Sequence, residues 1–86
     1  MPEISRFKGI TIHIYYDDHN PPHFHAIHGE DEALFSIETL EIIKGKLPKK
    51  AILQVVQWAF LNRSQLKKNW EKVKNDQQPD GIKPLK

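Results

Sequence analysis

The spacing of the hydrophobic residues changes once along this chain of 86 residues, close to Pro48. Before this point, Ile10, Ile12 and Ile14 alternate with polar residues, which is the two-residue period of a half-buried strand. After it, hydrophobic residues recur at helical spacing, on a face made of Ile52, Val55, Val56, Ala59 and Phe60. A run of strands followed by helix predicts an α+β fold.

Turn signals divide the first part of the chain into four strands. The loop at 17–22 ends the first strand because its two prolines have no N–H for a ladder. Three further extended segments follow, separated by turns, at residues 23–28, 33–38 and 40–44. Short connections of this kind favour an antiparallel four-stranded β-meander, packed against one or two C-terminal α-helices that begin after Gly45-Lys46. Ser64 is the expected N-cap of a second helix.

The chain is short enough to form only one hydrophobic core. We expect a single domain over residues 1–76, with strands at about 7–46 and helices at about 48–75. Residues 77–86 are expected to form a flexible C-terminal tail. A domain this small buries only about 60 to 65% of the surface that its unfolded chain exposes, so a homo-oligomer or a partner protein would add stability.

The residue types that the sequence lacks exclude several classes of site. The chain contains no cysteine, which rules out disulfides, a thiol nucleophile and thiolate metal ligands. No leader pattern is visible at the N-terminus, and no run approaches the roughly 18 apolar residues of a membrane span. We therefore expect a cytoplasmic protein without a membrane partner.

Charge is distributed unevenly along the chain, although the net charge is only +2. Residues 1–48 carry four basic and eight acidic side chains, whereas residues 49–86 carry nine and three. The helical part can thus offer a cationic face to phosphate or to an acidic partner. The alternative is a solvated lysine-rich helix surface, which is common in helices.

Histidines are the most informative residues of the sequence. Four of them lie within ten residues, and a fifth precedes them on the first strand: His13, His19, His23, His25 and His28. Residues two apart on a strand share a face, so Phe24 and Ala26 can join the isoleucines in the core while His23 and His25 point away. If the two strands pair as a hairpin, the opposite face collects His13, Tyr15, His23 and His25.

One chemistry that fits this cluster is metal-free acid and base catalysis. One histidine would take a proton from a ribose hydroxyl and another would protonate the leaving oxygen. The candidate catalytic residues are His19, His23 and His25. The candidate substrate-binding residues are Arg6, Lys8, Tyr15 and Asn20, with Lys46 as a further cation for phosphate.

The second chemistry is a divalent metal such as zinc, bound by nitrogen and oxygen ligands. The candidate ligands are His13, His23, His25 and Asp18. A His-x-His pattern is weak evidence for such a site. The third interpretation is that these histidines are ordinary strand residues and that Pro21-Pro22 only stiffens a turn. The cofactor is therefore either none or a divalent metal.

Several segments of the chain also resemble a known family. They are 1–7, the run Asp18-His19-Asn20-Pro21-Pro22-His23-Phe24-His25-Ala26, 37–41, 69–71 and 81–85. In these segments the chain resembles the bacterial family catalogued as domain of unknown function 4160. Where that family usually has a tyrosine near position 28, this chain has His28.

The resemblance implies a small prokaryotic protein encoded beside a second small protein, as in toxin–antitoxin pairs. It supplies no catalytic assignment. Combined with the histidine chemistry, it leads us to expect a histidine-dependent toxin that cleaves or binds RNA, with a cognate small protein as partner. The alternative is a non-enzymatic module that binds a partner or a metal.

Overall fold

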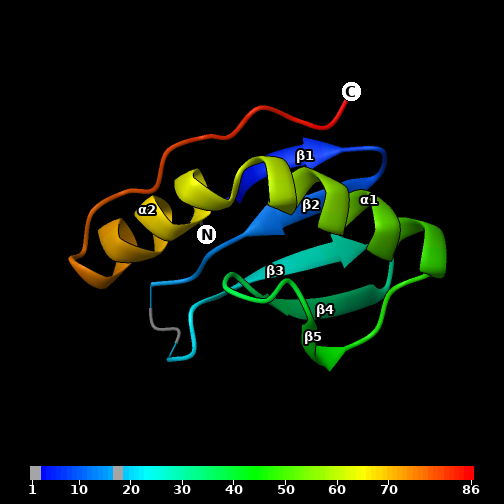
Figure 1. Cartoon of the computed structure of the whole chain (residues 1–86), viewed down its shortest axis with the longest axis horizontal. Helices are drawn as coiled ribbons and strands as arrows, with labels where there is room; N and C mark the ends of the chain where they lie inside the picture. The colour runs from blue at the N-terminus through cyan, green and yellow to red at the C-terminus, as the bar shows by residue number, and fades with distance from the viewer. Residues whose placement is uncertain (1–2, 17–18) are drawn as a thin grey trace.

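The computed structural model of the protein describes residues 3–16 and 19–86, and its strands and helices are arranged in two layers (Figure 1). The strands are β1 (Glu3–Phe7), β2 (Ile10–His13), β3 (His23–His28), β4 (Asp31–Ser36) and β5 (Ile42–Gly45). The helices are α1 (Lys49–Leu61) and α2 (Arg63–Lys74). Both helices lie on the same side of the sheet, which confirms the α+β class.

The sheet is an antiparallel meander with the strand order β1-β2-β3-β4-β5. It has five strands, so the prediction of four was wrong. The strand that was not predicted is β1. Its pairing with β2 shifts register between Glu3 and Ser5. This irregularity buries both Ile4 and Phe7, which are three residues apart, so β1 does not show the two-residue period by which a strand is recognised.

The hydrophobic core lies between the sheet and the two helices. Ile10 and Ile12 of β2 are fully buried, as are Phe24 of β3 and Phe35 of β4. Trp58 of α1 reaches into this layer and contacts Phe24 edge-on, with 5.9 Å between the ring centroids. The core therefore occupies one face of the sheet, and the other face carries no helix.

The helical part of the chain forms two elements separated by one residue, Asn62. The Asn62 side chain donates to the carbonyl oxygen of Trp58 at 2.8 Å, and the Asn62 carbonyl accepts from the N–H of Leu66. The second helix begins at Arg63, so the expectation of an N-cap at Ser64 was wrong. Within the described residues, neither helix has the length and hydrophobicity that crossing a bilayer requires.

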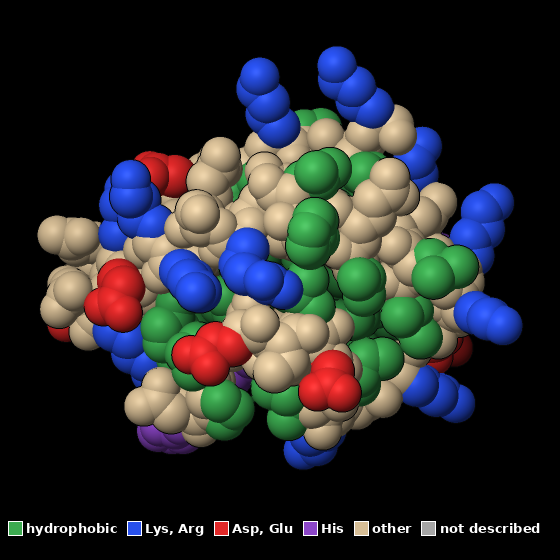
Figure 2. Space-filling view, viewed as in Figure 1, with side chains coloured by type: hydrophobic (Ala, Val, Ile, Leu, Met, Phe, Trp, Pro, Cys, Tyr) green, Lys and Arg blue, Asp and Glu red, His purple; other side chains and the backbone are tan. Residues whose placement is uncertain are grey.

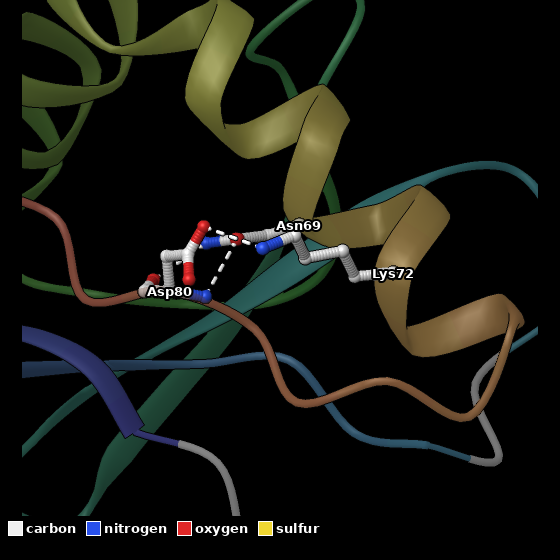
Figure 3. A network of polar contacts seen from close by, with 3 residues as sticks. All are labelled: Asn69, Lys72 and Asp80. Atoms are coloured by element: carbon white, nitrogen blue, oxygen red, sulfur yellow. Dashed lines mark hydrogen bonds and ion pairs between the residues drawn. The ribbon is translucent and has the colours of Figure 1, made fainter.

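The C-terminal segment runs back past the helices toward β1 (Figure 1). It has no regular secondary structure, but hydrogen bonds hold it at three places. Asn69 bonds both backbone groups of Asp80 (Figure 3), the N–H of Ile82 donates to Ile4 at 2.7 Å, and Trp58 donates to the carbonyl of Lys83. Ile82 is buried. The segment that was expected to be a flexible tail thus lies against the edge strand β1.

Candidate functional site on the uncovered face of the sheet

The pairing of β2 with β3 places the histidines as the alternation of the sequence predicts. The two strands form an antiparallel hairpin in which His13 lies opposite His25 and Ile12 lies opposite Ala26. Phe24 and Ala26 are fully buried in the core. His13 and His25 consequently project from the face that the helices leave uncovered.

Four rings form a chain of contacts that begins on this face and ends at His23, beside Trp70 of α2. We call them the histidine cluster: His13, Tyr15, His25 and His23. The His13 and Tyr15 rings are stacked with centroids 5.9 Å apart, and the Tyr15 ring meets His25 edge-on at 4.3 Å. His25 and His23 are 5.2 Å apart. His23 and His25 are only 7% and 9% exposed, which distinguishes them from ordinary surface histidines.

His25 is held by a carboxylate from the neighbouring strand. Its Nδ1 atom lies 2.9 Å from Oε2 of Glu32 on β4. An ionised carboxylate can only accept, so Nδ1 carries the hydrogen and Nε2 is the nitrogen that exchanges a proton in this tautomer. A histidine fixed by a carboxylate in this way is a frequent arrangement for proton transfer.

The environment of His13 disfavours its charged form. Burial is the main cause and lowers the pKa of His13. The Glu3 carboxylate opposes this effect, His25 adds to it, and Glu32 opposes it more weakly. Its Nδ1 atom is buried and has no hydrogen-bond partner among the residues that the structure describes. A neutral imidazole has a lone pair that can accept a proton, so His13 suits the role of a base.

His23 has a different environment from His25. Its Nδ1 donates to the carbonyl oxygen of Pro21 at 2.8 Å, and its ring packs against Trp70 of α2 with centroids 5.4 Å apart. These contacts join the loop before β3 to the second helix. His23 therefore positions the loop and His25, in addition to any chemistry of its own.

An open pocket of about 350 Å³ gives access to His25. Its lining consists of His25, Glu32, Leu34, Lys44 and Gly45. Lys44 belongs to β5, where it pairs with Leu34 of β4. The pocket thus combines an imidazole, a carboxylate and an ammonium group from three neighbouring strands, a set that can bind an anionic substrate beside a proton-transfer group.

The predicted substrate-binding residues are distributed over the molecule. Arg6 pairs with Thr11 across β1 and β2, and its guanidinium bonds Glu3 at 2.8 Å. Asn20 is exposed on the loop before β3. Lys8 lies in the turn between β1 and β2, at the end of the sheet away from that loop, and it is not part of the pocket beside His25.

His19 and the predicted metal site are less defined. His19 is exposed, and no contact described for residues 3–16 and 19–86 joins it to His23 or His25. Asp18 lies outside the described residues. Within the described part of the chain, no group of three histidine or acidic side chains is arranged to hold a metal ion. A zinc-type site formed by these residues stays a prediction.

Sequence reasoning overlooked Glu32 and Lys44. Glu32 lies between the extended segments predicted at 23–28 and 33–38, but the tight turn at Gly29 pairs His28 with Asp31 and places Glu32 in β4. Counting back from that pair puts Glu32 on the same face as His25. The length of this turn was thus enough to predict the position of Glu32. Predicting the position of Lys44 requires the register of β5 as well.

Comparison with known proteins supports the resemblance found in the sequence. The family model described as Domain of unknown function (DUF4160) matches residues 9–71, which is most of the chain. The chain belongs to the DUF4160 family. The match contains the whole histidine cluster together with Glu32 and Lys44, whereas β1 and the C-terminal segment of this DUF4160 protein lie outside it. No curated protein and no solved structure matches the chain.

Proposed function

We propose that this DUF4160 protein is a metal-free, histidine-dependent ribonuclease that acts as the toxin of a two-protein system. The observation that carries the proposal is the 2.9 Å contact between His25 and Glu32 in an open pocket close to His13. A neutral histidine and a second one oriented by a carboxylate are the two groups that cleavage of a ribose phosphodiester needs.

In the proposed reaction His13 acts as the base. It removes the proton of a ribose 2′-hydroxyl, and that oxygen attacks the adjacent phosphorus. The bond from phosphorus to the 5′ oxygen breaks, and His25 gives its Nε2 proton to the leaving oxygen. The products are a 2′,3′-cyclic phosphate and a 5′-hydroxyl end, and Glu32 balances the charge on the His25 ring while the ring carries both protons.

Cations on the same face support a phosphate-bearing substrate. Lys44 lines the pocket beside His25, and Arg6 lies on the same face, opposite Thr11 of the strand that carries His13. Arg6 is paired with Glu3 at the surface, and an exposed pair of this kind exchanges readily with solvent or ligand. We expect Lys44 to contact the phosphate directly and Arg6 to act from the edge of the site.

The test is cleavage of a short single-stranded RNA by purified protein in the presence of a chelator. His13→Gln and His25→Gln should each lower the rate by about 10²- to 10⁴-fold, as expected for loss of an acid or base. Glu32→Gln should lower it by about 10- to 100-fold, because the ring loses its orienting partner. Glu41→Gln is the matched control, since it also removes an exposed carboxylate but lies in the loop before β5.

A modified substrate, a growth assay and one further variant sharpen the result. RNA with 2′-O-methyl riboses should resist cleavage, and growth arrest on induced expression should disappear with His25→Gln. An unchanged rate in His19→Gln would remove His19 from the reaction. Cleavage that is equal in wild type and His25→Gln, or that depends on added metal, would refute the proposed mechanism.

A second candidate function, binding of a partner protein, is favoured by the outer side of α1. Residues 51–61 contain no charged side chain, although α1 lies at the surface. Leu53, Phe60 and Leu61 are 63%, 67% and 69% exposed, and we call these three residues the α1 stripe. Figure 2 shows hydrophobic side chains gathered on this side of the molecule. A helix that is apolar on most sides is usually covered by another element.

The charges around the α1 stripe select the kind of partner. Lys49 and Lys50 begin the helix, and the Arg63 guanidinium lies 5.8 Å from the centre of the Phe60 ring. A second copy of this chain would bring the same cations together across a symmetric interface, whereas an acidic partner would complement them. The cognate small protein implied by the family resemblance is therefore proposed to present an acidic, apolar surface here.

Co-purification tests this candidate. Tagged wild-type protein should retain the co-expressed neighbouring small protein, and Leu53→Ser with Phe60→Ser should lose it. Tyr16→Ser is the matched control, because Tyr16 is also an exposed hydrophobic residue but lies in the loop after β2. Retention of the neighbour by the double variant would show that the α1 stripe is not the interface.

A further inference from the structure

A second pocket lies on the helical side of the sheet, away from the histidine cluster. Its volume is about 470 Å³, and its lining consists of Lys8, His28, Pro48, Lys50, Ala51 and Gln54. These residues come from the turn between β1 and β2, the end of β3 and the start of α1. Two lysines and a histidine, separated in sequence, thus meet around one cavity.

The backbone conformation at Lys8 is one that disfavours lysine. Phe7 pairs with Ile10, so Lys8 and Gly9 form a two-residue hairpin turn, and both have positive φ, at 49° and 77°. A turn of this type favours asparagine followed by glycine. A lysine in the left-handed region costs roughly 1 to 2 kcal/mol relative to a residue that adopts it freely. Such strain is often kept where the side chain has a function.

The charges around the pocket all have one sign. Among the described residues, no aspartate or glutamate contributes to its lining. Gln54 adds an amide that can donate a hydrogen bond, and His28 can donate from its ring. A cavity of this composition concentrates positive potential, which favours an anion with several acceptor oxygens.

We propose that this pocket binds a phosphate monoester group, held by Lys8, Lys50 and His28. A monoester carries close to two negative charges at neutral pH, whereas the phosphodiester of a nucleic-acid backbone carries one. Two ammonium groups without a competing carboxylate therefore match the doubly charged monoester better than the singly charged phosphodiester. The group can come from free phosphate, a mononucleotide or the 5′ end of an RNA, which share the same terminal oxygens.

This site is distinct from the proposed catalytic site. His28 has the strand parity of Phe24 and Ala26, so it faces the helices, whereas His25 faces the uncovered side. The two residues are also separated along β3 by roughly 10 Å, at about 3.3 Å for each residue. One phosphate group cannot occupy both places, so binding here is measured independently of cleavage.

The test is titration followed by amide chemical shifts, with four probes at low ionic strength. They are inorganic phosphate, adenosine monophosphate, and one short RNA with either a 5′-phosphate or a 5′-hydroxyl. The RNA titrations use His25→Gln protein, so that the RNA is not cleaved during the measurement. The first three probes should saturate and shift Lys8 and Lys50, and the 5′-hydroxyl RNA should bind at least about tenfold more weakly.

Lys8→Asn separates binding from folding. It supplies the asparagine that the turn favours, so the protein should be at least as stable as wild type while phosphate affinity falls about tenfold or more. Lys50→Gln should weaken binding similarly, and the exposed Lys83→Gln is the control that should not. Absence of saturation, equal binding of both RNAs, or unchanged affinity in Lys8→Asn would each overturn the proposal.

Discussion

The environment of His13 makes a measurable link between ionisation and stability. Burial lowers the pKa of His13 in the folded protein, below its ordinary value of about 6.5. Between these two pKa values the unfolded chain binds a proton that the folded protein does not. The free energy of unfolding should therefore fall as the pH drops from about 7 through 6.5 and toward the folded pKa.

Two measurements check this expectation. The ring protons of His13 should titrate at a lower pH in the folded protein than in a urea-unfolded sample. Urea unfolding of His13→Gln at several pH values should lack the part of the pH dependence that His13 supplies. A His13 that titrates above 6.5, or a variant with the same pH dependence as wild type, would contradict the role of burial.

The alternation of single residues was enough to predict which side His23 and His25 face. Phe24 and Ala26 are too apolar to leave the core, and a strand places their neighbours on the other side. The partner of His25 could not be found in this way. Glu32 reaches His25 only through the register of the hairpin between β3 and β4, which depends on the geometry of the turn.

At the scale of elements, β5 shapes the pocket because Gly45 allows it to approach β4 closely. Gly45 has a φ of 86°, and a Cβ atom there would lie 2.2 Å from the backbone oxygen of Glu32. Gly45→Ala should therefore displace β5, lower stability by at least about 2 kcal/mol and disturb the Lys44 side of the pocket. Urea unfolding and the amide shifts of β4 would show both effects.

Gly29 provides the matched comparison for this prediction. It also has a positive φ, of 60°, but a Cβ atom there would meet nothing within 4 Å. Gly29→Ala should cost only about 1 kcal/mol, the strain of the left-handed conformation alone. Equal losses in the two variants would show that close approach to Glu32 does not control the position of β5.

The edge strands were the least predictable elements. β1 escaped detection because its register shift breaks the alternation between Ile4 and Phe7. β5 was predicted approximately, as a short strand at residues 40–44, and the structure places it at Ile42–Gly45. Both lie at the limits of the sheet, where one neighbour is missing and the hydrophobic pattern is weaker. The helices were easier to predict, because hydrophobic residues recur at helical spacing after Pro48. The predicted face of α1 was correct at Val55 and Ala59 but wrong at Phe60, which is exposed.

At the scale of the whole molecule, the C-terminal segment lies against the edge strand β1. Its contacts join residues that are far apart in sequence, such as Ile82 with Ile4, and no local sequence pattern predicts such contacts. Polar residues and Pro79 in this segment made it resemble a flexible tail. The segment lies beside β1 at the edge of the sheet, where it forms one backbone hydrogen bond, from Ile82 to Ile4. An uncovered edge strand favours association with other chains.

Asn69 and Lys72 test how firmly this segment is held, because both reach Asp80 from α2 (Figure 3). Asn69 is buried and bonds the backbone N–H and carbonyl of Asp80 at 2.9 and 2.8 Å. Asn69→Ala leaves both groups without this partner and should cost about 2 to 3 kcal/mol. Lys72 only forms an exposed ion pair with the Asp80 carboxylate, so Lys72→Ala should cost less than about 0.5 kcal/mol.

Urea unfolding gives the two losses, and hydrogen exchange of the Ile82 amide reports the segment itself. That amide bonds Ile4 and should be protected in wild type and in Lys72→Ala, but should exchange much faster in Asn69→Ala. If Ile82 exchanges freely in the wild type, the segment is a tail in solution and the cost of Asn69→Ala should shrink to that of Lys72→Ala. A large cost together with a protected amide makes residues 77–86 part of the folded domain.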